Sequence, residues 1–257
     1  MTYLVKEPHE SPDYPSNSAY VIERIVAIMK NSIVNGKNLI LIHTNLKRGL
    51  PLENINKVAG PFVEAWAVEQ FEDAVEQIGN EYQLVNVQAG TRLASYDVIL
   101  QFKKTASATT YVSGNIDVKA TAEDIANSGK SPNITSFARI RSEYINDPDY
   151  LFIILSLKHK VYGDRDSESG MTKGVMEVVS CSVYDLKYIS NPDINYNPAL
   201  GTGQIQIRDI HYVTLEQRTT QQFVQLLDSK YIKSKGQEAW IKLARKFQWI
   251  KEDADGL

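Results

Sequence analysis

Apolar residues recur every three to four positions in several stretches of the chain, which is the spacing of one face of a helix. In the first stretch Val21, Ile25 and Met29 follow this spacing, and Gly36 supplies a stop just beyond it. The pattern predicts helices over residues 18–34, 61–78, 134–144, 217–231 and 236–247.

Short apolar or alternating runs between these helices are typical of strands. The predicted strands cover residues 38–43, 82–87, 97–102, 111–120, 150–162, 175–185 and 204–213, and polar loops cover 45–51 and 191–203. The order of elements predicts an α/β fold with a mixed sheet flanked by helices. A length of 257 residues fits one large domain or two small ones. Because no clear linker interrupts the chain, we expect a single domain over 1–257, with an extended N-terminal segment at 1–18.

Two acidic residues and a lysine lie on neighbouring predicted strands. Asp117 and Lys119 are two positions apart, so in a strand both side chains point to one face. The polar stretch 103–110 predicts a turn that joins the strands into a hairpin. If that hairpin is symmetric about Ser107, Asp97 lies directly opposite Asp117. Two carboxylates and an ammonium would then share one small site.

This combination of groups suits the hydrolysis of a phosphodiester. Two carboxylates can hold Mg²⁺, a hard cation that neutralises charge developing on phosphorus and lowers the pKa of an attacking water. Lys119 would position that water or help to deprotonate it. The alternative is that these residues are ordinary solvated charges on the outer face of a half-buried sheet, because such combinations are common.

Composition narrows the class of protein without deciding its function. A net charge of −3 argues against a general polycation, yet basic residues gathered in one cleft can still bind DNA. No apolar run approaches the length of a membrane span, and the N-terminus lacks the apolar core of a secretory signal. The single Cys181 cannot form an internal disulfide. We therefore expect a cytoplasmic protein with no membrane partner. The candidate cleft cations are Lys47, Arg48, Lys103, Lys104, Lys130, Arg139 and Arg141.

Together with the acidic hairpin, five further stretches make the chain resemble a known family. The stretches are 45–47, 49–57, 128–137, 183–190 and 197–207. The chain resembles the PD-(D/E)XK type II restriction endonucleases, most closely the HpaI family, which cleaves GTTAAC, and more distantly the HincII family. This resemblance implies a restriction-endonuclease-like core and a homodimer that straddles a palindrome in double-stranded DNA.

The resemblance also assigns roles at the acidic hairpin. Asp97, Asp117 and Lys119 match the catalytic set of the family, and the Val118 carbonyl matches a further metal ligand. Glu64 resembles the family's helical acid. The chain departs from the nominal pattern because a tyrosine stands where a proline precedes the first aspartate, but that proline is not a metal ligand. The interval between the aspartates is also somewhat long, which leaves the turn length open. The implied cofactor is Mg²⁺.

Specificity in such enzymes comes from contacts with base edges, which loops are expected to carry. By resemblance, the recognition segments are 131–133 and 197–204. Asn133 and Asn197 are the expected base contacts, because an amide can donate and accept at once, as adenine requires in the major groove. Alternatively, both asparagines only stabilise turns. The predicted DNA-binding residues are Asn133, Ser131, Pro132, Asn197, Thr202, Gln204, Lys130, Lys47 and Arg48.

The resulting expectation is a Mg²⁺-dependent type II endonuclease of a restriction-modification system that cuts GTTAAC, with blunt ends bearing 5′-phosphates. One alternative is a sequence-specific DNA-binding protein that keeps the fold without cutting. The other is a PD-(D/E)XK nuclease of repair or RNA processing that reads nucleic-acid structure rather than sequence.

Overall fold

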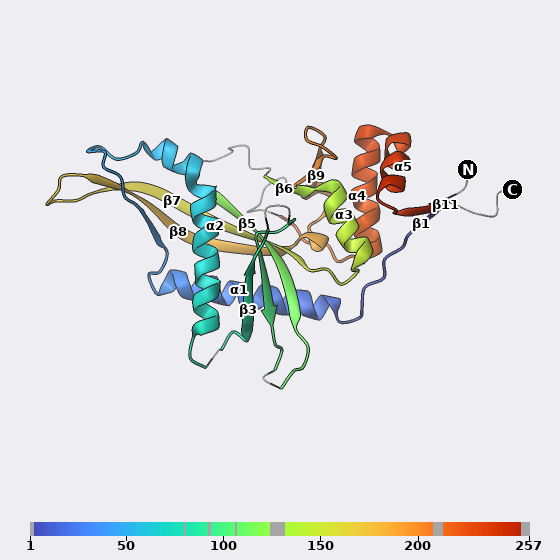
Figure 1. Cartoon of the computed structure of the whole chain (residues 1–257), viewed down its shortest axis with the longest axis horizontal. Helices are drawn as coiled ribbons and strands as arrows, with labels where there is room; N and C mark the ends of the chain where they lie inside the picture. The colour runs from blue at the N-terminus through green and yellow to red at the C-terminus, as the bar shows by residue number, and fades with distance from the viewer. Residues whose placement is uncertain are drawn as a thin grey trace. The chain divides into compact units, whose positions relative to one another are not determined.

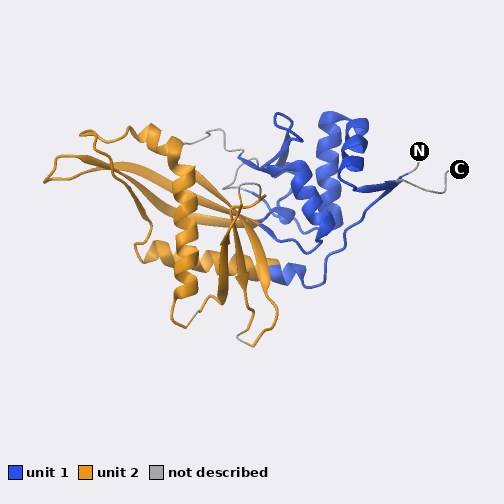
Figure 2. Ribbon diagram, viewed as in Figure 1, with its two compact units in different colours: residues 1–17, 130–152, 185–257 blue, residues 18–129, 153–184 orange. Residues whose placement is uncertain are grey.

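The computed structural model describes residues 3–79, 81–91, 94–105, 107–123, 132–207 and 213–252, and their contacts separate into two compact units (Figure 2). Unit 1 consists of residues 1–17, 130–152 and 185–257, and unit 2 of residues 18–129 and 153–184. Each unit therefore draws on separate stretches of chain. The expectation of a single domain stays a prediction. In the described part of the chain, no helix has the length and apolar character needed to cross a bilayer.

Unit 2 is built on a six-stranded mixed sheet with the strand order β2-β8-β7-β5-β4-β3 (Figure 1). The elements that lie wholly or mainly in unit 2 are α1 (Tyr14–Val34), β2 (Leu39–Ile42), α2 (Leu52–Glu76), β3 (Leu84–Ala89), β4 (Val98–Phe102), β5 (Val112–Ala122), β7 (Phe152–Arg165) and β8 (Thr172–Asp185). On one face of the sheet, Gly114 of β5 leaves room for Val21 of α1, since a Cβ there would lie 2.9 Å from a Val21 methyl. Side chains alternate along β5, so Asp117 points to the opposite face, toward Glu64 of α2.

Unit 1 combines a three-stranded sheet, ordered β6-β10-β9, with three helices and a two-stranded ribbon, β1-β11 (Figure 1). Its elements are β1 (Tyr3–Val5), β6 (Asn133–Ser136), α3 (Phe137–Asn146), the 3-10 turns η1 (Leu186–Tyr188) and η2 (Asn191–Asp193), β9 (Ile194–Asn197), β10 (Gln204–Ile207), α4 (Thr220–Lys235), α5 (Gln237–Lys246) and β11 (Ile250–Glu252). The ribbon pairs Tyr3 with Glu252 and Val5 with Ile250, so it joins the first strand of the chain to the last.

A buried ion pair lies among the helices of unit 1. Arg141 of α3 is fully buried, and its guanidinium donates to both carboxylate oxygens of Asp228 on α4, at 2.6 and 2.8 Å. Trp240 Nε1 of α5 donates to the same carboxylate at 2.7 Å, and the guanidinium lies 4.1 Å from the ring centroid of Trp249. A buried charge is tolerated only when it is paired and hydrogen-bonded, so these contacts fix the three helices together.

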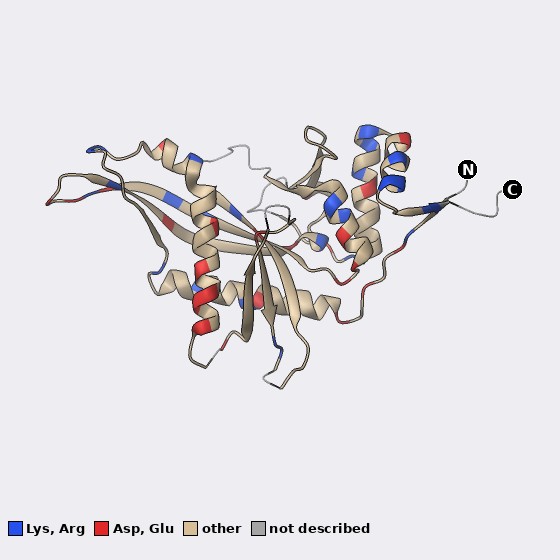
Figure 3. Ribbon diagram, viewed as in Figure 1, with Lys and Arg blue, Asp and Glu red and all other residues tan. Residues whose placement is uncertain are grey.

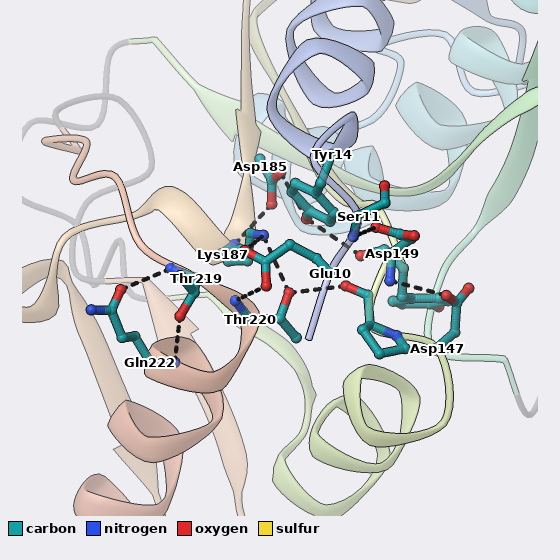
Figure 4. A network of polar contacts seen from close by, with 12 residues as sticks. Glu10, Ser11, Tyr14, Asp147, Asp149, Asp185, Lys187, Thr219, Thr220 and Gln222 are labelled. Carbon is teal, nitrogen blue, oxygen red and sulfur yellow. Dashed lines mark hydrogen bonds and ion pairs between the residues drawn. The ribbon is translucent and has the colours of Figure 1, made fainter. Parts of the chain in front are cut away.

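A second buried network holds the N-terminal segment within unit 1 (Figure 4). The Glu10 carboxylate accepts hydrogen bonds from Lys187 Nζ at 3.3 Å and from the Thr220 backbone N–H at 2.9 Å. The Lys187 ammonium is fully buried and lies 3.1 Å from the ring centroid of Tyr14, whose hydroxyl donates to Asp185 at 3.0 Å. This network connects the segment before α1 to the start of α4.

The strands β1 and β11 were not predicted, and the observed elements differ from the predicted ones most clearly in four further places. Helix α1 begins at Tyr14 rather than residue 18, and Pro15 is accepted there because the first turn of a helix needs no N–H donor from it. Helix α2 begins at Leu52 and continues through Pro61, because the buried stripe of Ile55, Ala59 and Val63 runs across that proline. The predicted buried strand at 38–43 is instead the edge strand β2, on which Leu41 is 48 % exposed.

The fourth difference concerns the small sheet of unit 1. The helix predicted over 134–144 is divided into β6 and α3, and the loop predicted over 191–203 contains β9. Both strands are four residues long and pair with β10, which lies far from β6 in sequence. Periodicity within such short segments carries little information, so neither strand is evident until its pairing with β10 is known.

The β9–β10 turn supplies a test of packing in unit 1. Gly203 has φ +88°, and an added Cβ would overlap the ring of Tyr196, which packs edge-on against Phe137. Gly203→Ala is expected to lower the free energy of unfolding by about 3 kcal/mol, from positive-φ strain plus the clash. Gly201→Ala is the matched control, since Gly201 has φ +51° with open space around it, and should cost about 1 kcal/mol. Urea unfolding followed by tryptophan fluorescence measures the free energy of unfolding of both variants. An equal decrease in the two variants would contradict a clash at Gly203.

Candidate functional site

The predicted hairpin register is confirmed between β4 and β5 of unit 2. Val98 pairs with Ile116 and Phe102 with Val112, the register expected for a hairpin symmetric about Ser107. The regular register ends at Val98: the Asp97 N–H donates to the Ile116 carbonyl at 2.8 Å, so Asp97 lies near Asp117 at an irregular strand end rather than directly opposite it. The Asp97 carboxylate accepts from the Val118 N–H at 2.7 Å, which turns it across the hairpin.

Asp117 and Lys119 share one face of β5, as the two-residue spacing predicts. The ammonium of Lys119 lies 2.8 Å from Oδ1 and 2.7 Å from Oδ2 of Asp117, and it is 3.5 Å from the Val118 carbonyl oxygen. Only the Oδ1 contact has hydrogen-bond geometry, so Oδ2 is a buried oxygen without a hydrogen-bond donor. Asp117 is 4 % exposed, whereas the Lys119 side chain is 22 % exposed. The lysine therefore connects a buried carboxylate to a partly open surface.

Glu64 joins this group from helix α2. Its side chain is half-buried and lies within electrostatic range of Asp97 and Lys119. The structure therefore brings together all four side chains proposed for catalysis from the sequence, three on one hairpin and one on a helix that packs over it. Their chemical roles remain predictions.

Burial and like charge perturb the acids of this cluster. The pKa of Asp117 is raised to about 7, chiefly by burial; the nearby carboxylates of Asp97 and Glu64 contribute to the rise, and Lys119 opposes it. Burial likewise raises the pKa of Glu64, and Asp97 adds to that rise. Strongly perturbed carboxyl groups that face a lysine are typical of functional sites.

The donor chemistry of the cluster fits a hard divalent cation. It offers the buried Asp117 oxygen without a hydrogen-bond donor, the Asp97 carboxylate and the Val118 carbonyl. In the described residues, no three His, Cys, Asp or Glu side chains converge closely enough to hold a metal as they stand. A metal would therefore require the carboxylates of Asp97 and Asp117 to turn from their present partners, Val118 and Lys119.

The raised pKa of Asp117 predicts how stability depends on pH in the metal-free protein. Because the folded-state pKa of about 7 exceeds the usual 3.8, the folded protein loses stability as pH rises between these values. Asp117→Asn stays neutral and should raise the free energy of unfolding at pH 8 by roughly 2 kcal/mol, with little gain at pH 4. Urea unfolding in EDTA at both pH values measures this. Asp73→Asn, which changes a carboxylate in an exposed ion pair, is the control. If Asp117→Asn raised the free energy of unfolding equally at both pH values, ionisation of Asp117 would not be the cause.

The described recognition candidates of unit 1 gather on its small sheet. Asn133 lies on β6, Asn197 on β9 and Gln204 on β10, where Gln204 pairs directly with Asn197. Thr202 lies in the turn before β10, where its hydroxyl is 2.9 Å from that of Ser136. The alternating buried residues Ile205 and Ile207 occupy the other face of β10. One face of this sheet is consequently rich in side-chain amides.

The remaining recognition candidates are more scattered. Pro132 directly precedes β6, and Lys130 and Ser131 lie outside the described residues. Lys47 and Arg48 lie in unit 2, exposed in the loop between β2 and α2. Arg141, a candidate cleft cation from the sequence, is instead the buried partner of Asp228.

Sequence reasoning missed two amides on the small sheet. Gln206 pairs with Asn195 of β9, and its Nε2 donates to Oδ1 of Asn133 at 3.0 Å. The alternation of residues 204–207 could have found Gln206, since a strand places it on the same face as Gln204. Asn195 carried no such signal, because β9 was predicted to be a loop.

Charge is unevenly distributed along the helices of each unit (Figure 3). Helix α2 of unit 2 carries a series of acids: Glu64, Glu69, Glu72, Asp73 and Glu76. Helices α4 and α5 of unit 1 carry a series of bases: Lys230, Lys233, Lys235, Lys242, Arg245 and Lys246. A net charge of −3 thus coexists with basic helices suited to a polyanion, although the sequence reasoning did not select them.

Comparison with known proteins identifies the family. The family described as type II restriction endonuclease HpaI matches residues 2–248. The type II restriction enzyme HpaI of Haemophilus parainfluenzae is 54 % identical over 249 residues, which cover 96 % of this chain and 97 % of that protein. The structure of the NlaIV restriction endonuclease is similar in fold, with a TM-score of 0.50 and 14 % identity over 89 % of this chain and 85 % of that one. The α/β fold is therefore restriction-endonuclease-like, and the chain belongs to the HpaI family of type II restriction endonucleases, which hydrolyse phosphodiester bonds.

Proposed function

We propose that this protein is a Mg²⁺-dependent homodimer that cuts both strands of double-stranded DNA at the centre of GTTAAC, leaving blunt ends with 5′-phosphates. The observation that carries the proposal is the convergence of Asp97, Asp117 and Lys119 on one hairpin, in a chain 54 % identical to HpaI. The target is carried over from the family. A two-fold dimer suits a two-fold palindrome, because each protomer then meets the same half-site.

Each residue of the cluster has a distinct task in the proposed hydrolysis. Asp97, Asp117 and the Val118 carbonyl would hold Mg²⁺, which supplies positive charge at the phosphate and lowers the pKa of bound water. Lys119 orients the attacking water through Nζ, and its charge offsets that of the phosphate. Glu64, whose pKa is raised, can hold a proton beside Asp97. Water adds to phosphorus as the bond to the 3′-oxygen breaks, which yields a 3′-hydroxyl and a 5′-phosphate.

Binding is assigned to residues outside this cluster. The amides of Asn133, Asn197 and Gln204 are suited to base edges because each can donate and accept. Thr202, Pro132 and Ser131 belong to the same recognition segments. The cations Lys47, Arg48 and Lys130 are proposed to contact phosphates, which set register rather than sequence preference. We also place this activity in the cytoplasm, where the DNA substrate lies.

The two alternatives predict different behaviour toward duplex DNA. A non-cutting DNA-binding protein would have no use for the paired Asp117 and Lys119, which weighs against it. A repair or RNA-processing nuclease would cut according to nucleic-acid structure and would not yield discrete duplex fragments.

The target can be tested with two plasmids that differ only in a single GTTAAC. Incubation with Mg²⁺ is expected to linearise only the plasmid that bears the site, and sequencing of the ends should show a blunt central cut. Discrete cutting elsewhere would keep the enzyme class and reject the target. Binding without cutting would favour the non-cleaving alternative.

The catalytic assignment can be tested with Asp117→Ala. The variant should lose at least about 1,000-fold in cleavage rate, because it lacks a carboxylate proposed to hold the metal. It should bind GTTAAC duplexes in Ca²⁺ with nearly unchanged affinity, as measured by fluorescence anisotropy. Asp73→Ala, which removes an exposed carboxylate of α2, is the control and should cut normally. Cleavage by Asp117→Ala at the rate of the control would reject the assignment.

A further inference from the structure

Gln206 and Asn133 face one another across a local irregularity in the small sheet of unit 1. Gln204 pairs with Ser136 and Ile205 with Thr135, so regular pairing would place Ile134 opposite Gln206. The register shifts at this point, and Asn133 is the residue opposite Gln206 instead. A bulge of this kind re-aims a side chain without ending the strand pairing.

The irregularity keeps apolar and polar side chains apart. Ile134 is 7 % exposed and stays in the core, whereas Asn133 is exposed on the face that carries the amides. In a regular pairing, the side chain opposite Gln206 would be the isoleucine, and Asn133 would point to the other side. The strand geometry thus places this asparagine specifically beside Gln206.

The contact between the two amides fixes the orientation of one of them. Gln206 Nε2 donates to Asn133 Oδ1 at 3.0 Å, from a position 73 residues away in the chain. An exposed asparagine without such a contact can exchange its oxygen and nitrogen by rotation about χ2. With Oδ1 held by Gln206, the Nδ2 group keeps a defined direction, and the second lone pair of Oδ1 still accepts a hydrogen bond.

A fixed amide is what sequence discrimination requires. Adenine presents an acceptor at N7 and a donor at N6 in the major groove, and an asparagine reads both only in one of its two amide orientations. Orienting the side chain before DNA binds avoids the entropy cost of ordering it at the interface.

We infer that Gln206 is a positioning residue, which holds the Asn133 amide in the orientation that reads one base pair of the target. The inference rests on the proposed function, because it takes Asn133 as a base contact. Gln206 acts through Asn133 and needs no contact of its own with a base.

A double-mutant cycle tests this coupling. Asn133→Ala, Gln206→Ala and the double variant are compared with the wild-type protein by single-turnover cleavage of the cognate duplex and of duplexes with one base pair changed. Asn133→Ala should reduce discrimination at one base pair by about 5- to 150-fold. Gln206→Ala should reduce discrimination at the same base pair by about fivefold. The double variant should match Asn133→Ala within about twofold, because the effect of Gln206 passes through Asn133.

Two further variants separate positioning from general damage. Gln206→Glu keeps the size of the side chain but lacks the donor at neutral pH, so it should lose discrimination as Gln206→Ala does. Gln225→Ala changes an exposed glutamine of α4 and should keep full discrimination. Thermal unfolding midpoints of all variants should stay close to that of the wild-type protein.

Other outcomes would overturn the inference. If Gln206→Ala reduced discrimination at a different base pair, and this reduction added to that of Asn133→Ala, Gln206 would read a base itself. If Gln206→Ala slowed cleavage of every duplex by the same factor, the role of Gln206 would be purely structural or phosphate-binding.

Failure of the proposed function gives a different result from failure of this inference. If the wild-type protein cuts discretely at another sequence, the proposed target fails, and the cycle is run on the sequence recovered from the fragment ends. If it binds without cutting, the same cycle is measured as affinity in Ca²⁺. In either case, coupling between the two amides supports the inference and additive losses reject it.

Discussion

The antiparallel register between β4 and β5 is the constraint on which the cluster of Asp97, Asp117 and Lys119 depends. The buried side chains of Val98, Leu100 and Ile116 lie on the face that α1 covers, and Gly114 leaves the space that Val21 fills. A slip of one residue would expose this apolar face and send the charged side chains into the core. The packing of an apolar surface thus determines where Asp97 and Asp117 meet, although neither residue contributes to that packing.

The same burial that fixes the register makes the charged face costly. Asp117 is almost fully enclosed, two other carboxylates lie near it, and Lys119 is the cation that compensates for them. Desolvation and like-charge repulsion disfavour the ionised form of a buried acid, which the raised pKa of Asp117 reports. The hairpin therefore maintains an arrangement of charge that the isolated strands would not adopt. Strain of this electrostatic kind is usual where a fold serves a reaction rather than its own stability.

Sequence reasoning succeeded where neighbours in sequence determine the geometry. The relation of Asp97, Asp117 and Lys119 follows from strand alternation and one short hairpin, so it could be read directly. The position of Glu64 near them depends on the packing of α2 over the sheet, and in the sequence only the family resemblance indicated it. Strands β6 and β9 were not predicted, because each has only four residues: β6 pairs with β10, which is distant in sequence, and β9 forms a short hairpin with β10. Alternation along the strand could have placed Gln206 on the amide face, but its pairing with Asn133 depends on a register shift that no local pattern encodes.

Because of the ribbon β1-β11, the two units can be completed at different times during synthesis of the chain. Every residue of unit 2 precedes residue 185, so that unit can close while the rest of the chain is still being made. Unit 1 contains both Tyr3 and Ile250, and its first strand has no partner until its last one leaves the ribosome. At translation rates of about 5–20 residues per second, that wait lasts roughly 12–50 s. The unit that carries the amide face is therefore the last to be completed, and a partly synthesised chain can hold a folded acidic hairpin before unit 1 is complete.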